Sequence, residues 1–467
     1  MEALVAIAPP SMVGVAVRRG YLLQLGVVGA AYVIAGKLGI TLSVAHGVIT
    51  PVWAPSGIAL AALLIFGRSL WPAVAVGAFL TNATSGAEPL VAAGIAAGNT
   101  LEALAGPFLL DRAKFRIDLG RVRDVLALVV LAAGLSTLIS ATNGVAVLSM
   151  AGIAQGSLGS DWVLWWFGDA VGILMVTPFL LLAYIHRGTV PTKARVLEMA
   201  ALLLSVAAIS SSVFLGGAWR YPYLLFPPLL WAALRFQQLG AATCSFLVGT
   251  LATWGTVAGR VPIHDTSATG RVQVIQALVG VLAISLLLVG ATLAEREAAN
   301  RAVEQTAAML TEAQALTHIG SWDWDIATDN VSWSDELYRI FGLTPQSVEI
   351  TAGFVRERIH RDDRALFDEQ VQRAFVKRQS LDLELRILVA DGRTRLLHVR
   401  GRAVLGVSEE PERMAGTAQD VTERRQAETL RDDILSTVSH ELRTPLASVL
   451  NFALTLQDEV ADAVLRC

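Results

Sequence analysis

Long apolar runs fill this chain up to Leu293 and constrain its fold more than any other feature. Of its 467 residues, 54% are hydrophobic and 16% are charged, whereas about a quarter of the residues in a soluble domain are charged. From Glu295 onward the composition becomes that of a soluble protein. The sequence therefore predicts a polytopic α-helical membrane domain, held in a lipid bilayer, with soluble segments after it.

A helix needs about 20 apolar residues to cross a bilayer, and the apolar runs supply about ten such segments. We predict spans at residues 21–44, 50–67, 69–84, 88–110, 125–150, 162–185, 196–216, 222–235, 238–258 and 272–293. Lys and Arg favour cytoplasmic loops. With the N-terminus inside, the outside connections carry Arg220, Arg260 and Arg271, and most other Lys and Arg residues of the connections fall inside. We therefore expect ten spans with both termini in the cytoplasm.

Bulk charge and cysteine content exclude several classes of function. The net charge of -3 argues against a nucleic-acid partner. The two cysteines, Cys244 and Cys467, cannot build a disulfide framework or a zinc site. We expect no bound metal ion.

Charged residues within the predicted spans mark candidate sensing positions. Glu102 and Asp169 lie in apolar surroundings, and Lys37 lies in the first span. Buried charges in membranes are costly and usually face the bundle interior or a cavity. They fit either a structural pair, such as Lys37 with a carboxylate, or a ligand or proton site, for which Asp169 is the better candidate. Trp165 and Trp166 beside it also fit an interfacial position.

The membrane segment resembles a known sensor family. The run VWAPSGIALAALLIFGRSLWPAVAVGAFLTN is similar to the signature of the first type of MASE membrane-associated sensor domain, and three later blocks, AAGNTLEAL, WWFGDAVGILMVTPFLLL and YPYLLFPPLLWAALRFQQLGA, follow in the family's order. The resemblance covers about Tyr21 to Ala294. It implies an integral sensory module, at 1–294, that feeds a cytoplasmic output, and it adds Trp53 of VWAPSG to the candidate sensing residues. It does not supply the stimulus.

A helical connector and an α+β segment follow. Residues 295–315 lack Gly and Pro and predict a helix that continues out of the last span, either as a passive linker or as a signalling helix. Apolar residues alternate with polar ones at 322–325 and 381–387, which predicts half-buried strands. Asp391-Gly392 predicts a hairpin turn before a strand that contains Leu397. Helices are expected at 336–341 and 362–376.

Residues 316–424 resemble a PAS domain with its C-terminal motif. The matching stretches are GSWDWDIATDNVSWSDELYRIFGLTP, IHRDDRALFDEQVQRAF, LELRILVADGRTRLLHVRGRAV and MAGTAQDVTERRQAE. The resemblance implies an antiparallel sheet flanked by helices. The segment has no cysteine for a flavin photoadduct, and its histidines, His318, His360 and His398, favour a structural role over haem ligation. We expect a signal relay or an unidentified small ligand, and leave the cofactor unknown.

The chemistry-bearing motif is SHELRTPL at residues 439–446. Apolar residues at 427, 430, 434, 438 and 442 predict one face of a helix, and Pro445 predicts a kink just after His440. A neutral imidazole is nucleophilic near pH 7 and can accept a phosphoryl group. Glu441 is placed to handle the ring proton, and Thr444 lies one turn on.

Residues 425–467 resemble the dimerisation and phosphoacceptor domain of histidine kinases, over DDILSTVSHELRTPLASVLNFA. The resemblance implies that His440 is the phosphoacceptor, that Glu441 and Thr444 act with it, and that the intact family is homodimeric. The family's ATP-binding domain, which would hold ATP and magnesium, has no counterpart in the 467 residues, so we expect a truncated phosphoacceptor domain without autophosphorylation by this chain alone.

These features predict a sensor histidine kinase of a bacterial two-component phosphorelay, multi-pass in the inner membrane, with a response-regulator receiver domain as partner. A non-catalytic receptor or regulator that pairs with intact kinases is the first alternative. A cyclic-dinucleotide enzyme would need a GGDEF-like or EAL-like block, which does not follow the PAS segment. A transporter would leave the cytoplasmic relay unexplained.

Overall fold

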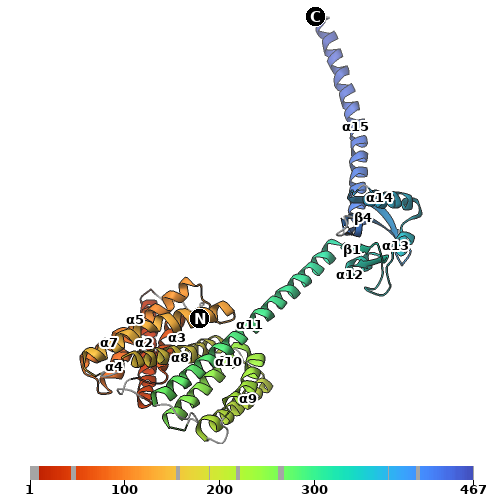
Figure 1. The fold of residues 1–467 in the computed structure, drawn as a ribbon. Helices are drawn as coiled ribbons and strands as arrows, with labels where there is room; N and C mark the ends of the chain where they lie inside the picture. Colours follow the sequence, from red (N-terminus) through yellow and green to blue (C-terminus); the bar gives the residue numbers. More distant parts are fainter. Residues whose placement is uncertain are drawn as a thin grey trace. The chain divides into compact units, whose positions relative to one another are not determined.

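The computed structural model describes residues 10–43, 49–153, 158–188, 190–216, 221–260, 268–376, 378–405 and 411–465. The described chain forms two compact units, Met1–Asn300 and Arg301–Cys467 (Figure 1). The predicted outside connections around Ser157 and Thr266 lie partly outside the described residues.

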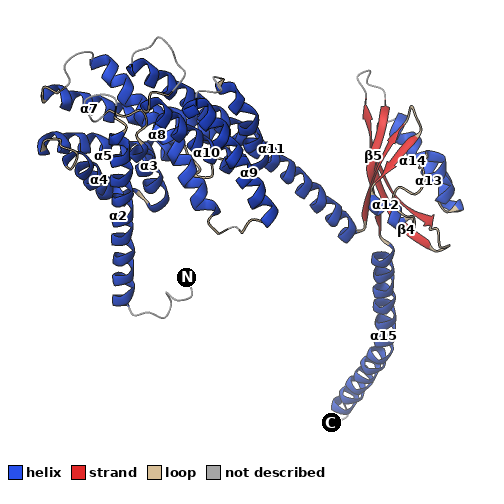
Figure 2. Ribbon diagram, turned by 90° about the horizontal axis from the view of Figure 1, so that it is seen from below, coloured by secondary structure: helices blue, strands red, loops and turns tan. Residues whose placement is uncertain are grey.

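The first unit is built from helices (Figure 2). The α-helices are α2 (Pro10–Thr41), α3 (Ala54–Phe66), α4 (Trp71–Ala83), α5 (Pro89–Arg112), α6 (Val122–Ala127), α7 (Thr137–Met150), α8 (Leu158–His186), α9 (Lys193–Ser211), α10 (Phe226–Val257) and α11 (Ala268–Thr317). Two 3-10 turns, η1 (Arg68–Leu70) and η4 (Pro222–Leu225), and two π-helical stretches, η2 (Leu128–Ser136) and η3 (Ser212–Gly216), join them.

Each of the ten predicted apolar segments falls on helical structure, but ten crossings are not confirmed. Five helical segments are long and apolar enough to span a bilayer: Gly20–Thr41, Val122–Met150, Leu158–His186, Lys193–Gly216 and Gly270–Thr317. By contrast, α3 and α4 have 13 residues each, which reach about 20 Å at ~1.5 Å per residue, short of a hydrocarbon core of roughly 30 Å.

The break that we predicted between residues 235 and 238 is present. Within α10, Gln237 has φ 51 and ψ -135, so two helical halves meet there at a kink. The π-helical stretch η2 was not predicted, since apolar periodicity does not report the extra residue in its turns. It frees the carbonyl of Gly134, which accepts a hydrogen bond from Trp166 Nε1 at 3.0 Å.

Helix α8 lies at the centre of the first unit, where glycines bring backbones into close contact. A Cβ on Gly57 of α3 would lie 2.4 Å from the carbonyl oxygen of Gly172 on α8. Apolar side chains of α8, including Val171, Met175 and Leu182, then pack in two clusters with residues of α9, α10 and α11. The central position of α8 explains why Asp169, within it, is 1% exposed.

The second unit contains a five-stranded sheet (Figure 2); its pairing is antiparallel, as the PAS resemblance implied. Its strands are β1 (Ile319–Asp325), β2 (Asn330–Trp333), β3 (Leu381–Leu388), β4 (Thr394–Leu405) and β5 (Pro411–Asp420), in the order β2-β1-β5-β4-β3. The flanking helices are α12 (Asp335–Ile340), α13 (Ala352–Arg358), the 3-10 turn η5 (Arg361–Asp363) and α14 (Arg364–Val376). The predicted hairpin turn is present, with Gly392 at φ 85.

Two long helices enter and leave the sheet. The predicted connector helix is confirmed, since α11 extends without interruption from Ala268 to Thr317. After the sheet, α15 (Thr422–Leu465) carries the SHELRTPL motif. It is helical on both sides of Pro445, and the kink at this residue stays a prediction.

Candidate functional site

An extended segment, residues 49–53, interrupts the helices of the first unit and shapes its polar centre. It lies against α8, where a Cβ on Gly168 would come within 2.8 Å of Thr50 O and one on Gly172 within 2.1 Å of Trp53 O. Non-helical backbone is tolerated at membrane depth only where protein groups satisfy it. Trp53 N donates to Gly168 O at 2.9 Å, so α8 supplies part of that satisfaction.

The two predicted carboxylates, which lie far apart in the sequence, lie close to one another beside this segment. Glu102 on α5 lies one helical turn after Asn99, which lines the same cavity as Asp169 on α8. Glu102 and Asp169 are 3% and 1% exposed. Ser56 Oγ on α3 donates to Asp169 Oδ1 at 3.2 Å. Glu102 Oε2 and Asp169 Oδ2 are buried and have no hydrogen-bond partner in the described part of the chain.

A relay of neutral hydrogen bonds surrounds the carboxyl pair and crosses four helical segments. Trp165 Nε1 donates to Ser140 Oγ at 3.1 Å, and Ser140 Oγ donates to Asn99 Oδ1 at 2.9 Å. Asn99 Nδ2 then donates to the hydroxyl of Tyr32 at 3.0 Å. These residues come from α8, α7, α5 and α2, so the relay ties the bundle together around the acids.

A cavity of about 20 Å³ adjoins Asp169. Trp53, Asn99, Trp165 and Gly168 line it together with Asp169. A void needs roughly 10–15 Å³ to hold a water molecule, so this one has room for a single water. The structure therefore brings all three candidate sensing residues to one place: Asp169 and Trp53 line the cavity, and Glu102 lies one helical turn after Asn99 of its wall.

One of the alternatives considered for these residues is wrong. Lys37 Nζ donates to Ser85 Oγ at 2.7 Å, which differs from the expected pairing with a carboxylate. Trp165 is 9% exposed and donates to Ser140, so it lies inside the bundle, and its depth in the bilayer stays a prediction. Sequence reasoning missed Tyr32, Ser56 and Ser140, because a lone hydroxyl in an apolar run gives no signal of what it contacts.

The same centre contacts the helix that leaves the bundle. Gln276 on α11 is 1% exposed, and its Nε2 donates to Pro51 O at 2.8 Å and to Leu164 O at 3.2 Å. One side chain of α11 thus binds both the extended segment and α8. A displacement of either would act on α11 through these two hydrogen bonds.

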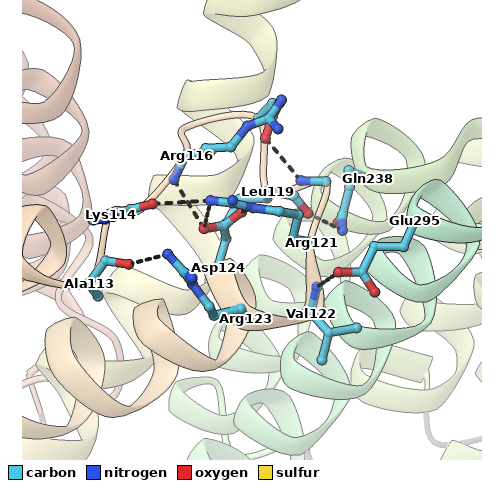
Figure 3. A network of polar contacts seen from close by, with 12 residues as sticks. Ala113, Lys114, Arg116, Leu119, Arg121, Val122, Arg123, Asp124, Gln238 and Glu295 are labelled. Carbon is cyan, nitrogen blue, oxygen red and sulfur yellow. Dashed lines mark hydrogen bonds and ion pairs between the residues drawn. The ribbon is translucent and has the colours of Figure 1, made fainter. Parts of the chain in front are cut away.

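A second polar network contacts α11 at Glu295 (Figure 3). The carboxylate of Asp124, which is 0% exposed, accepts from Arg121 Nε at 2.7 Å and from Arg121 Nη2 at 2.8 Å. This pair shapes the connection between α5 and α6. Gln238 Nε2 donates to Leu119 O at 2.6 Å in that connection, and Glu295 on α11 accepts from Val122 N at 3.2 Å. The connection therefore holds α10 and α11 beside one another.

The sheet unit contains an apolar cavity of about 590 Å³. Part of its wall is aromatic and is formed by Trp322, Trp324, Trp333, Phe341 and Phe367. The indole nitrogen of Trp322 is buried and has no hydrogen-bond partner among the described residues, whereas Trp324 Nε1 donates to Asp329 Oδ1 at 3.1 Å. The Trp322 nitrogen is buried away from the cavity space, so Trp322 offers the apolar part of its ring to an occupant.

The three histidines of residues 316–424 make local polar contacts, and none is among the described residues that line the cavity. His318 Nδ1 lies 3.3 Å from Glu336 Oε1, and His360 Nδ1 accepts from Asp362 N at 3.4 Å. His398 Nε2 lies 2.7 Å from Asp382 Oδ1, and this hydrogen bond lowers the pKa of Asp382. Each histidine has a structural partner of its own.

The entrance and exit of the sheet unit lie on paired strands. Strand β1, which follows α11, pairs with β5, which precedes α15, and Ile319 lies opposite Gln419. Gln419 Nε2 donates to Thr317 O at 3.2 Å, at the end of α11. Asp420 Oδ2 forms an ion pair with Arg395 Nη1 at 3.2 Å. Asp420 Oδ1 accepts a hydrogen bond at 2.6 Å from the hydroxyl of Thr422, at the start of α15. Strain in β1 can therefore pass to α15 across one strand pair.

The predicted phosphoacceptor lies on α15 and is accessible. His440 and Glu441 are exposed, and the side chains of Thr444 and Pro445 lie outside the described ones. The predicted apolar face is also exposed, with Leu430 at 62%, Ile434 at 53% and Leu442 at 54%. An apolar stripe on an isolated helix needs a partner surface. Both the histidine and the stripe are therefore exposed in the described part of the chain.

The hydrogen-bond relay yields a direct test. Ser140→Ala would leave Asn99 Oδ1 and Trp165 Nε1 without partners, which we expect to cost about 1–3 kcal/mol of unfolding free energy. Thermal unfolding of the protein in lipid nanodiscs measures the change. The matched control is Ser149→Ala, because Ser149 is exposed on the same helix. Equal unfolding temperatures for the two variants would contradict the role of the relay.

Comparison with known proteins finds histidine kinases that are similar to part of this chain. The chain is similar to the curated Blue-light-activated histidine kinase of Brucella anthropi, with 29% identity over 159 residues, which cover 34% of this chain and 32% of that protein. The protein of the same name from Brucella ovis is 26% identical over 194 residues, which cover 41% of this chain and 38% of that protein. The chain thus spans about a third of the length of these curated relatives.

Solved structures match over part of the chain. A sensory box histidine kinase/response regulator from Burkholderia thailandensis E264 is 32% identical, with a TM-score of 0.24, and the match covers 29% of this chain and 97% of that chain. A domain of a light and redox sensing histidine kinase from Haloarcula marismortui is 22% identical, with a TM-score of 0.21, over 24% of this chain and 98% of that chain.

Two family descriptions account for most of the sequence. Residues 330–418 match the PAS fold, which agrees with the five-stranded sheet and its helices. Residues 23–297 match MASE1, a membrane sensor domain, and the apolar helices of the first unit fit a membrane protein. Because the MASE1 match covers more than half of the 467 residues, the chain belongs to the MASE1 family, as a membrane sensor protein that also carries a PAS domain and is homologous to histidine kinases.

Proposed function

We propose that this chain is the sensory part of a histidine kinase in a two-component phosphorelay, and that it controls phosphorylation of His440. The observation that carries the proposal is the SHELRTPL motif, with His440 and Glu441 exposed, on a helix directly after a PAS domain, in a MASE1 protein with histidine-kinase relatives. In this proposal residues 1–294 sense, 295–315 connect, 316–424 relay, and 425–467 belong to the phosphoacceptor domain. The receiving partner is the receiver domain of a response regulator.

The chemistry follows from the side chains of the motif. The imidazole of His440 attacks the transferred phosphoryl group, and Glu441 accepts the ring proton or fixes the tautomer. Thr444, one helical turn on, orients a water molecule for the reverse, dephosphorylating reaction. The donor is ATP with magnesium, held by an ATP-binding domain of the histidine-kinase family. The exposed apolar stripe of α15 supports a homodimer, in which two such helices cover one another.

The phosphoacceptor assignment is tested with labelled ATP and a purified histidine-kinase ATP-binding domain added in trans. We expect acid-labile label on the chain, and its loss to background in His440→Gln because the nucleophile is gone. Glu441→Gln should slow labelling by about 10²–10⁴-fold, the usual contribution of a general base. The control His398→Gln, in the PAS domain, should keep the label. Label that survives His440→Gln would refute the assignment.

We further propose that the membrane unit crosses the inner membrane ten times, with both termini in the cytoplasm. The non-helical segment 49–53 supports this count, because it precedes the short helix α3 directly and adds to its reach. The segment lies against α8, and Trp53 N and Pro51 O have partners in α8 and α11. A span made of half helix and half extended chain is compatible with the bilayer when protein covers it.

Reporter fusions on either side of α5 test this topology. Alkaline phosphatase fused after Thr84 should be active, because that connection is expected in the periplasm, and green fluorescent protein fused after Lys114 should fluoresce, because that connection is expected in the cytoplasm. The reciprocal fusions serve as controls and should be silent. A cytoplasmic signal at both positions would contradict the ten-span arrangement.

We also propose that the PAS cavity holds a small, mainly apolar molecule. The apolar, aromatic wall supports this class of ligand. The curated relatives are called blue-light-activated, but the PAS segment of this chain has no cysteine for a flavin adduct. In this proposal the ligand is held by packing.

Mass spectrometry of solvent extracts from the purified protein tests the PAS proposal. We expect a compound whose recovery falls by at least about fivefold in Val399→Phe, because Val399 lines the cavity and overpacking a filled site costs about 1–3 kcal/mol. Val404→Phe is the matched control, because Val404 lies on the same strand and is 38% exposed. A compound lost equally from both variants, or from neither, would count against an occupied cavity.

A further inference from the structure

We propose that Glu102 and Asp169 form a proton-binding site, and that release of its proton is transmitted to α11 through the extended segment 49–53. This inference rests on the proposed sensory role of the membrane unit and names its ligand. It draws on three observations: two buried carboxyl groups, each with an oxygen that has no partner among the described residues, the water-sized cavity beside Asp169, and the hydrogen bonds that join this place to α11.

Two neighbouring buried carboxyl groups favour a shared proton. A carboxylate only accepts hydrogen bonds, so two carboxyl groups can bond to each other only when one of them carries a hydrogen atom. Two ionised carboxylates in contact would repel strongly in a low-dielectric interior. The pair therefore binds one proton between two oxygen atoms and carries a single negative charge.

The surroundings supply dipoles and no countercharge. Ser56 on α3 donates to Asp169, and Tyr32 on α2 is the titratable group that faces the pair from the packed helices. Ser140 on α7 and Trp165 on α8 are neutral donors. Among the described residues, no Lys, Arg or His side chain forms a hydrogen bond or ion pair with Glu102 or Asp169. Proton binding is then the means by which the charge of the site can change.

The cavity offers the exchange partner for the proton. Asp169 is part of the cavity wall, and its volume of about 20 Å³ admits one water molecule. On release, the bond between the shared hydrogen and its carboxyl oxygen breaks and the proton passes to water. Both electrons of that bond stay on the oxygen, so two carboxylates remain and the charge of the pair becomes −2.

The release has a mechanical consequence because of what adjoins Asp169. Repulsion would separate α5 from α8 at this level. The carbonyl oxygen of Gly168, next to Asp169, accepts from Trp53 N at 2.9 Å, so α8 moves with the segment 49–53. Gln276 of α11 binds Pro51 O at 2.8 Å and Leu164 O at 3.2 Å. A change in the charge of the pair therefore reaches the helix that leaves the bundle through two hydrogen bonds.

Infrared difference spectroscopy of the full chain in nanodiscs tests proton binding without any kinase reaction. The wild type should show the carbonyl band of a protonated carboxylic acid near neutral pH, and this band should disappear as the pH is raised. The band should be absent from the double variant Glu102→Gln with Asp169→Asn and should persist in Glu88→Gln, since Glu88 is an exposed carboxylate before α5. A wild type without the band, or a double variant that keeps it, would overturn the proposal.

A second measurement covers the case in which the double variant does not fold. In Glu102→Gln a single carboxyl remains and no proton is shared, so the pH midpoint of the band should move by at least about one unit. The unfolding temperature of the wild type should fall as the pH rises through the loss of the band, and this fall should be smaller in Glu102→Gln. An unchanged midpoint and an unchanged fall would reject the shared proton. Loss of His440 labelling with the band intact would instead point to failure of the kinase proposal.

Discussion

The packing of the extended segment 49–53 against the glycine-lined face of α8 is the constraint on which the membrane unit depends. Backbone groups outside a helix cannot remain unpaired at membrane depth. Gly168 and Gly172 allow the segment to come close enough for Trp53 N to reach the carbonyl oxygen of Gly168. Any larger side chain at these two positions would separate the backbones. The polar centre beside them therefore requires glycine at both positions.

That close approach explains why polar groups gather where they do. The extended segment ends at Trp53, α3 begins at Ala54, and Ser56 in its first turn reaches Asp169. The acids are then enclosed by neutral donors from other helices and by α11. A sensing centre and a transmission helix are thus one packed structure, and Gln276 belongs to both.

In the second unit, a sheet connects the helix that enters with the helix that leaves. This sheet places the strand that follows α11 beside the strand that precedes α15, so entrance and exit share a ladder of backbone hydrogen bonds. The cavity lies under the same sheet, with Trp322 of β1 in its wall. An occupant that packs against Trp322 therefore acts on the strand through which a signal from α11 would pass. Two inputs, one from the membrane and one from a ligand, can meet at β1.

The sequence by itself determined the elements and the chemistry of local motifs. Apolar runs predicted the helices of the membrane unit and alternation predicted strands β1 and β3, because both signals depend on neighbours a few residues apart. The SHELRTPL motif identified His440 for the same reason. Only the tertiary structure decided which distant side chains meet. Glu102 and Asp169 could be selected as buried charges from the sequence, but their proximity, the relay through Ser140 and Tyr32, and the link from Pro51 to Gln276 depend on how helices pack. The contribution of α3 and the segment before it was also undecided by sequence, since an apolar run has the same composition whether it is helical throughout or extended for its first five residues.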